Sequence, residues 1–163
     1  MSSFPEFDSA AFRRAMSKFA TGVAHKNPRY EGAAQGIVVN SFASVSLDPA
    51  LVLWSIDKGS RRRAVFEHAD RQAIHILSKA QHAQCMALVK DATAFEGLDM
   101  IDRPDGPPLI EGCLARFECE PYASVDAGDH VTLIQKVITA SHQDAEPLVF
   151  FDRGFGHISK GSQ

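Results

Sequence analysis

The sequence predicts a mainly β domain with helices inserted between its strands. Short apolar runs recur along the chain, turn residues separate them, and residues 115–120 alternate apolar with charged side chains. Alternation with a period of two is typical of a half-buried antiparallel strand. Many short strands interrupted by helices favour an antiparallel barrel over a parallel sheet. Strand pattern alone leaves a β-sandwich open.

Composition narrows the class of protein. The 163 residues contain no repeat or interior linker, which predicts a single domain spanning residues 1–163. A net charge of −3 gives no general attraction to nucleic acid or to an anionic membrane. No segment reaches the roughly 18 apolar residues of a membrane span, and residues 1–8 do not resemble a signal peptide. Three cysteines, without a Cys-x-x-Cys pair, indicate a reducing, cytoplasmic location.

The first helix follows from capping and periodicity. Asp8 can cap a helix start, with Phe7 and Phe12 at the two positions of a hydrophobic staple. Met16 and Phe19 continue the same face at helical spacing. We therefore expect an amphipathic helix near the N-terminus.

The next elements include one predicted loop. The segment from His25 to Gly36 is polar and contains proline and glycine, which disfavour a buried strand. Strands are expected at residues 37–39 and 51–56, the second largely buried. A turn at residues 57–59 then leads into a helix that Ser60 can cap.

The second half repeats this pattern of strands, turns and one helix. In chain order, we expect a strand at 73–77, a helix at 79–90, a loop at 99–108, the alternating strand at 115–120, a turn at 126–129, strands at 131–140 and 148–151, a tight turn at 152–154 and a final strand at 155–158.

The segment from Gly36 to Pro49 is the most informative for function. It places small hydroxyl and amide side chains directly after an apolar strand. Asn40, Ser41, Ser44 and Ser46 offer donors and acceptors to a flat polar ligand. A serine-rich edge loop without a ligand is the alternative.

A second candidate site is the run from Asp57 to Arg63. Free N–H groups and the positive dipole at a helix start suit a phosphate, with Ser60 and a basic side chain, Lys58 or Arg61, completing the site. A solvated basic turn is the alternative. However, three arginines in a first helical turn oppose the helix dipole unless an anion offsets them.

The string Asn-Ser-Phe-x-Ser-Val-Ser-x-Asp-Pro within Gly36 to Pro49 resembles the flavin-reductase-like family. These are short-chain FMN-binding split barrels, among them the reductase components of two-component flavin monooxygenases. The later Gly128-Asp129-His130 falls at the expected distance, and the similarity runs from about Phe12 to Gly156. The resemblance implies a split β-barrel, usually a homodimer. It also implies an NAD(P)H-dependent reductase that supplies reduced FMN or FAD to a monooxygenase, with NADH or NADPH as electron donor.

The resemblance further implies roles for individual residues. His130 would lie beside the isoalloxazine and the nicotinamide as the catalytic residue, where an imidazole can orient the dinucleotide without transferring a proton. The segment around Asn40 would hold the isoalloxazine and ribityl chain, and the turn around Ser60 the phosphate. The expected flavin-binding residues are Val39, Asn40, Ser41, Phe42, Ala43, Ser44, Ser46, Asp57, Lys58, Ser60, Arg61 and Phe95.

Two departures from the family pattern bear on turnover. His25 to Pro28 replaces a run that is a core strand in the family, so we expect a first strand that is short, displaced or exposed. Val38 stands where a threonine is common, which removes one hydroxyl. A flavin-binding module without efficient turnover is therefore an alternative function.

Other classes of cofactor site find less support in the sequence. A split barrel that binds another flat cofactor, such as haem, is a further alternative, although no convincing axial ligand is present. The histidines include no His-x-x-x-His pair with a carboxylate partner, so no metal site is expected. Gly154-Phe155-Gly156 lacks the third glycine and the following helix of a dinucleotide fingerprint.

Overall fold

A computed structural model describes residues 8–30, 33–95, 99–158 and 161. Its helices are α1 (Ser9–Met16), α2 (Arg63–His68) and α3 (His82–Lys90), with a 3-10 turn, η1 (Lys79–Gln81), before α3. The strands are β1 (Thr21–Gly22), β2 (Ala24–Tyr30), β3 (Ala33–Ala34), β4 (Ile37–Val39), β5 (Ala43–Leu47), β6 (Ala50–Asp57), β7 (Gln72–Ile76), β8 (Met100–Ile101), β9 (Leu109–Ile110), β10 (Ala115–Ala127), β11 (His130–His142), β12 (Leu148–Phe151) and β13 (Gly154–His157).

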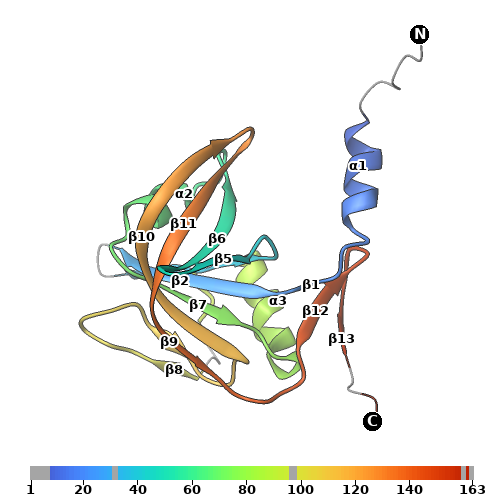
Figure 1. The fold of residues 1–163 in the computed structure, drawn as a ribbon. Helices are drawn as coiled ribbons and strands as arrows, with labels where there is room; N and C mark the ends of the chain where they lie inside the picture. Colours follow the sequence, from blue (N-terminus) through green and yellow to red (C-terminus); the bar gives the residue numbers. More distant parts are fainter. Residues whose placement is uncertain (1–7, 31–32, 96–98, 159–160, 162–163) are drawn as a thin grey trace.

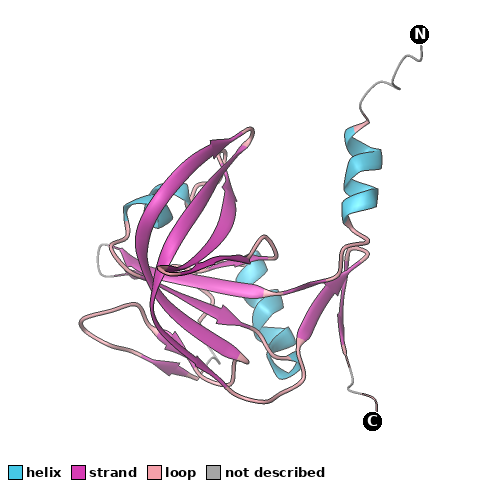
Figure 2. Ribbon diagram, viewed as in Figure 1, coloured by secondary structure: helices cyan, strands magenta, loops and turns pink. Residues whose placement is uncertain are grey.

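The main sheet has eight strands, and the strand pairs among the described residues are antiparallel, as the sequence predicts. Seven strands follow the order β3-β2-β7-β10-β11-β6-β5, and β4 pairs with β2. The sheet curls around a core, with α2 and α3 beside it, while α1, β1, β12 and β13 extend to one side (Figures 1 and 2). The mainly β fold with inserted helices is therefore confirmed.

The core forms where one face of β6 and β11 buries Trp54, Ile56, Val131 and Leu133. Trp54 is fully buried, and its ring meets Phe66 of α2 edge-on at 5.1 Å between centroids. Val131 and Leu133 of β11 complete this cluster. Truncating a buried aromatic side chain of this kind costs roughly 3–5 kcal/mol of stability. On the opposite face of the same two strands, Ser55 and Thr132 are half-buried.

The prediction of a loop from His25 to Gly36 is wrong. Strand β2 forms there and pairs with β7 on one side and with β4 and β3 on the other. Lys26 and Asn27, two of the polar residues that led to the loop prediction, are fully buried in the fold. Asn27 donates from Nδ2 to the carbonyl oxygen of Pro108 at 2.7 Å, and Lys26 lies between aromatic rings. Pro28 lies between the residues of β2 that pair with β4 and those that pair with β3. A proline is tolerated at such a gap because it has no N–H to donate to a neighbouring strand.

Helix α1 begins as its capping residue predicts, because Oδ1 of Asp8 accepts a hydrogen bond from the N–H of Ala10 at 2.9 Å. The staple partner Phe7 lies outside the described residues. On its apolar face, Phe12, Met16 and Phe19 are 53%, 52% and 70% exposed. Helix α1 therefore contributes no buried residue to the part of the chain that the structure describes.

The C-terminal hairpin of β12 and β13 holds the end of α1 in place. Its two-residue turn, Asp152 and Arg153, has φ values of 48° and 66°, as a tight hairpin turn requires. The N–H of Asp152 donates to the carbonyl of Ser17 at 2.8 Å, and Lys18 pairs with the Asp152 carboxylate at 2.7 Å. The predicted tight turn is confirmed.

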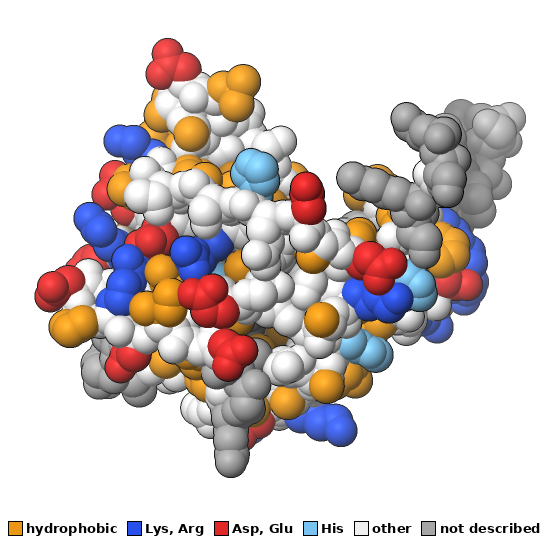
Figure 3. All heavy atoms as spheres, turned by 90° about the horizontal axis from the view of Figure 1, so that it is seen from below, with side chains coloured by type: hydrophobic (Ala, Val, Ile, Leu, Met, Phe, Trp, Pro, Cys, Tyr) orange, Lys and Arg blue, Asp and Glu red, His pale blue; other side chains and the backbone are white. Residues whose placement is uncertain are grey.

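Most remaining elements agree with the sequence within a few residues. The alternating strand is longer than predicted, since β10 continues to Ala127 and turns at Gly128, whose φ is +71°. The predicted loop at 99–108 contains the short strand β8. Acidic and basic side chains are interspersed on the face shown in Figure 3. Among the described helices, none is long and apolar enough to cross a bilayer.

Candidate functional site

Strand register brings two of the three predicted site regions together. Asp57, the last residue of β6, lies directly opposite His130, the first residue of β11. The N–H of Lys58 donates to the carbonyl oxygen of Asp129 at 2.9 Å, and its ammonium pairs with Asp126 at 2.7 Å. The turn at residues 57–60 and the Gly-Asp-His turn therefore form one structural unit.

Ser41 joins the third region to this unit. Its hydroxyl accepts from the N–H of Ser55 at 3.1 Å and contacts the Ser55 carbonyl at 3.3 Å. Ser55 lies two residues before Asp57, and its own hydroxyl meets that of Thr132 at 2.9 Å. The hydroxyls of Ser41, Ser55 and Thr132 thus link the Asn40–Ser46 segment to the strand of His130. Ser55 and Thr132 were not predicted as site residues.

Within the Asn40–Ser46 segment, neighbouring side chains take different directions. Asn40, Ser41, Ala43 and Ser44 are exposed, and Ser46 is half-buried. Phe42 instead turns inward, where its ring lies 5.7 Å from that of Phe117. Phe42 therefore anchors the segment to the core, while its polar neighbours can meet a ligand.

An apolar cavity of about 300 Å³ opens beside the start of this segment. Asn40 is the polar residue among its lining side chains, which come from β4, α3 and the C-terminal hairpin. They are Val23, Val38, Val39, Asn40, Met86, Val89, Phe150 and Phe155. Mostly apolar walls with few polar groups are typical of pockets for flat organic ligands.

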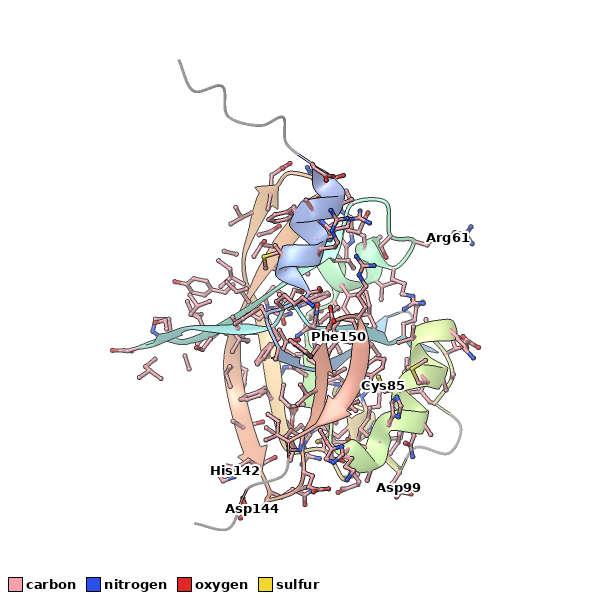
Figure 4. All side chains as sticks on the ribbon, turned by 90° about the vertical axis from the view of Figure 1, so that its right-hand side faces the viewer. Arg61, Cys85, Asp99, His142, Asp144 and Phe150 are labelled. Carbon is pink, nitrogen blue, oxygen red and sulfur yellow. The ribbon has the colours of Figure 1, made fainter. Side chains whose placement is uncertain are left out.

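The walls of this cavity include residues that the sequence did not mark as site residues. Met86 and Val89 are three apart on α3, so they share one side of the helix. Their helix is held by Cys85, which packs with Val23, Leu77 and Leu148. Figure 4 shows Cys85 on α3 and Phe150 on the neighbouring hairpin. The spacing of the two α3 residues was visible in the sequence, but their proximity to Asn40 depends on the tertiary fold.

The turn after β6 differs from its prediction in one respect. Helix α2 begins at Arg63, so Ser60 does not cap it. Oδ1 of Asp57 instead accepts from the N–H of Gly59 at 2.6 Å, and Oγ of Ser60 accepts from the N–H of Arg62 at 3.3 Å. These short-range bonds stabilise a separate turn ahead of the helix.

The three arginines of this turn have different surroundings. Arg62 donates to the carbonyl of Gly36 at 3.0 Å, and Arg63 to the carboxylate of Glu67 at 3.0 Å. Only Arg63 lies within α2, so three arginines do not crowd its first turn and that part of the phosphate argument is removed. Arg61 extends away from the body (Figure 4) and has no ion pair within the part of the chain that the structure describes.

His130 is held on one side and open on the other. Its Nδ1 lies 2.7 Å from Oδ1 of Asp129, and its side chain is 42% exposed. The hydrogen bond from His130, followed by its charge, lowers the pKa of Asp129. Since Nδ1 faces Asp129, Nε2 is the ring nitrogen that can meet a ligand.

Phe95 is placed near the start of the Gly36–Pro49 segment. The N–H of Gly36 donates to the carbonyl of Ala92 at 2.9 Å, three residues before Phe95. Phe95 is half-buried, and the two residues after it lie outside the described residues. Over the described ranges, no group of three or more His, Cys, Asp or Glu side chains could hold a metal ion.

Comparison with known proteins places this arrangement in a family. Residues 16–159 match the flavin reductase like domain. The FMN reductase (NADH) SmoA of Agrobacterium fabrum is 43% identical over 94% of this chain and 88% of its own length. The reductase subunit HsaB of a flavin-dependent monooxygenase from Rhodococcus jostii is 32% identical over 88% of this chain and 75% of its own.

Solved structures agree with the sequence comparison. The flavin reductase PheA2 in its native state superposes with a TM-score of 0.86 at 32% identity, covering 94% of this chain and 100% of that one. An NADH:FAD oxidoreductase of Streptomyces globisporus, SgcE6, in complex with NAD and FAD fragments, gives a TM-score of 0.88 at 27% identity, with 96% of each chain covered. The chain belongs to the flavin reductase-like family, and its fold is of the split-barrel kind. It is an oxidoreductase of that class.

Proposed function

We propose that this chain is an NADH-dependent flavin reductase whose flavin binds along the Asn40–Ser46 segment. One observation carries the proposal: the Asn40–Ser46 segment, the turn at residues 57–61 and His130 converge through hydrogen bonds and strand register. SmoA, at 43% identity, is named for NADH and FMN, which supports this choice of electron donor and acceptor.

The residues present fit a flavin. The apolar cavity beside Asn40 suits a flat aromatic ring, and the exposed amide and hydroxyls of Asn40, Ser41 and Ser44 suit its polar edge. Lys58 and Ser60, with the exposed Arg61, would hold the phosphate of FMN, or the diphosphate of FAD. When bound, the flavin supplies the capacity to accept a hydride.

The protein must position the nicotinamide against the flavin ring and exclude water from between them. His130, fixed through Nδ1 by Asp129, presents Nε2 on the same sheet edge as Asp57. There it would orient the nicotinamide against the flavin ring, and no proton transfer by the imidazole is required. The hydroxyls of Ser41, Ser55 and Thr132 would hold the Asn40–Ser46 segment in a fixed position relative to His130 and Asp57.

The alternative of a flavin-binding module without turnover loses its main support. It depended on a missing or displaced strand at His25 to Pro28, and β2 forms there as an interior strand of the sheet. Val38 in place of a threonine remains, and it lines the cavity. An apolar side chain at that position is compatible with an aromatic ring above it.

We further propose that the chain acts as a homodimer that passes reduced flavin to a monooxygenase. Relatives named as reductase components of monooxygenases support the monooxygenase partner. The homodimer is supported by exposed apolar side chains on α1 and just after it, and on β5, β10 and β11, because large exposed apolar patches mark interaction surfaces. They include Phe12, Met16, Phe19, Leu47, Tyr122, Val125 and Ile138. The cysteines at 85, 113 and 119 are buried thiols without disulfides, which supports a cytoplasmic location.

The direct test is steady-state turnover. Catalytic amounts of the purified protein, with NADH and an excess of FMN in air, should oxidise NADH at a rate proportional to protein concentration. The same assay with NADPH reports donor preference, and FAD in place of FMN reports the acceptor. A rate no greater than that without protein would reject the reductase function.

A further inference from the structure

Lys26 is the most unusual side chain in the interior of the sheet. It lies on β2 with 0% of its surface exposed, and its Nζ has no hydrogen-bond partner among the described residues. Lysine is almost never fully buried unless its amine is paired. An apolar side chain of the same length would fill this place at a lower cost of desolvation.

The amine of Lys26 instead contacts two aromatic rings. Its Nζ lies 4.7 Å from the ring centroid of Phe42 and 5.0 Å from that of Trp54. An ammonium is attracted by the faces of such rings, and the N–H bonds of an uncharged amine also favour them. Burial lowers the pKa of Lys26 well below its ordinary value, and the contact persists in either protonation state.

These two rings belong to the two segments that meet at the proposed flavin site. Phe42 stands between Ser41, which bonds to the backbone of Ser55, and Ala43, which pairs with Leu53. Trp54 stands between those same two residues of β6. The amine of Lys26 therefore contacts both the Asn40–Ser46 segment and β6 at the point where hydrogen bonding and strand pairing join them.

We propose that Lys26 is a positioning residue, whose amine links the rings of Phe42 and Trp54 and so fixes the flavin-binding segment against β6. Lys26 does not touch the flavin itself. The inference rests on the proposed function, because it takes the Asn40–Ser46 segment as the flavin site. It also gives a reason for a lysine at a place where packing alone would favour an apolar residue.

The test replaces the amine and keeps the length of the side chain. Lys26→Met should weaken FMN binding by about tenfold, or about 1.4 kcal/mol, because the segment is then no longer held in its binding conformation and must be ordered when FMN binds. The midpoint of urea unfolding should not fall, because the variant no longer buries an unpaired amine. Quenching of Trp54, the single tryptophan of the chain, by added FMN measures the affinity. Lys79→Met, at a surface lysine paired with Glu146, is the matched control and should change neither quantity.

A second variant separates positioning from packing. Phe42→Leu removes the ring that the amine contacts and should weaken FMN binding to a similar extent. Because both changes break the same link, the double variant should bind FMN no more weakly than either single variant. The KM for FMN should rise in each variant, and kcat should stay within about twofold in Lys26→Met, since Lys26 does not contact the flavin.

Three results would overturn the inference. Unchanged FMN affinity in Lys26→Met, with binding abolished by Ser41→Leu, would retain the flavin site and remove Lys26 from it. Weaker FMN binding by Lys26→Met together with a lower midpoint of urea unfolding would show that Lys26 only stabilises the fold. Fully additive losses in the double variant would show that Lys26 and Phe42 act independently. Failure of the wild-type protein to bind FMN at all would instead reject the proposed function, and this inference with it.

Discussion

Removing the guanidinium of Arg61 should weaken the binding of FMN and leave that of riboflavin unchanged. Arg62 and Arg63 are held by Gly36 and Glu67, so Arg61 is the arginine of this turn that is open to an anion. Ser60 is a poorer target, because its hydroxyl accepts from the N–H of Arg62 and its loss would disturb the turn itself. The variant of choice is therefore Arg61→Ala alone.

The size of the effect follows from the kind of interaction lost. A hydrogen bond to a charged group is worth about 1.5–3 kcal/mol, and each 1.4 kcal/mol changes affinity tenfold. Arg61 is exposed, so solvent screening places the loss at the lower end, about tenfold. The difference from wild type should shrink in high salt, since salt screens an exposed charge pair.

The assay is a pair of fluorescence titrations, with FMN and with riboflavin, which lacks the phosphate. Arg71→Ala is the matched control, because it removes the same charge from another exposed position. We expect Arg61→Ala to lose affinity for FMN only and Arg71→Ala to behave as wild type. Equal losses for FMN and riboflavin would refute the placement of the phosphate at this turn.

Three further predictions concern catalysis, stability and assembly. His130→Ala should lower the NADH-dependent rate by about 100-fold and leave FMN affinity within a few-fold, because it misplaces the nicotinamide and not the flavin; an unchanged rate would remove His130 from the site. Unfolding should protonate the released amine of Lys26, because its pKa is lowered in the folded state, so wild-type stability should rise with pH up to about pH 8 by at most about 1.4 kcal/mol per pH unit. Cys119, the titratable neighbour of this amine, remains a thiol in that range because burial raises its pKa to about 12. Lys26→Met should therefore be more stable at neutral pH by roughly 1–3 kcal/mol and should lose that slope in urea unfolding; an identical slope in both proteins would contradict the burial of a titrating amine. Leu47→Asp places a charge at a 96% exposed apolar position of β5 and should convert a dimer to a monomer in analytical ultracentrifugation; an unchanged mass would place the interface elsewhere.

The sequence predicted those strands whose own residues show an alternating or a continuous apolar pattern. Alternation around Cys119 marked β10, and the apolar run around Trp54 marked β6, because burial of one face or both imposes those patterns. The cap at Asp8 likewise marked the start of α1. Each of these features depends on residues that are close in sequence.

Strand β2 could not be predicted because its stability comes from distant partners. Nδ2 of Asn27 donates to the carbonyl of Pro108, and the amine of Lys26 lies against the rings of Phe42 and Trp54. In isolation, His25 to Pro28 is a polar run with a proline, which is typical of a loop. Tertiary contacts therefore overrode the local preference.

The candidate site was predictable as three segments but not as an assembly. Asn40–Ser46, the turn around Ser60 and His130 were each marked by their residue types. Their convergence depends on the register of β6 with β11 and on the bond from Ser41 to Ser55, which no local pattern encodes. The cavity walls from α3 and the C-terminal hairpin are likewise visible only in the fold.

The most direct test of the central claim is anaerobic reduction of flavin by NADH in the presence of this protein. With protein at a small fraction of the FMN concentration, the visible absorbance of the whole flavin pool should bleach, and air should restore it. In His130→Ala the bleaching should be about 100-fold slower. An FMN spectrum altered by binding, but no bleaching beyond that of NADH and FMN without protein, would show a flavin-binding protein that is not a reductase.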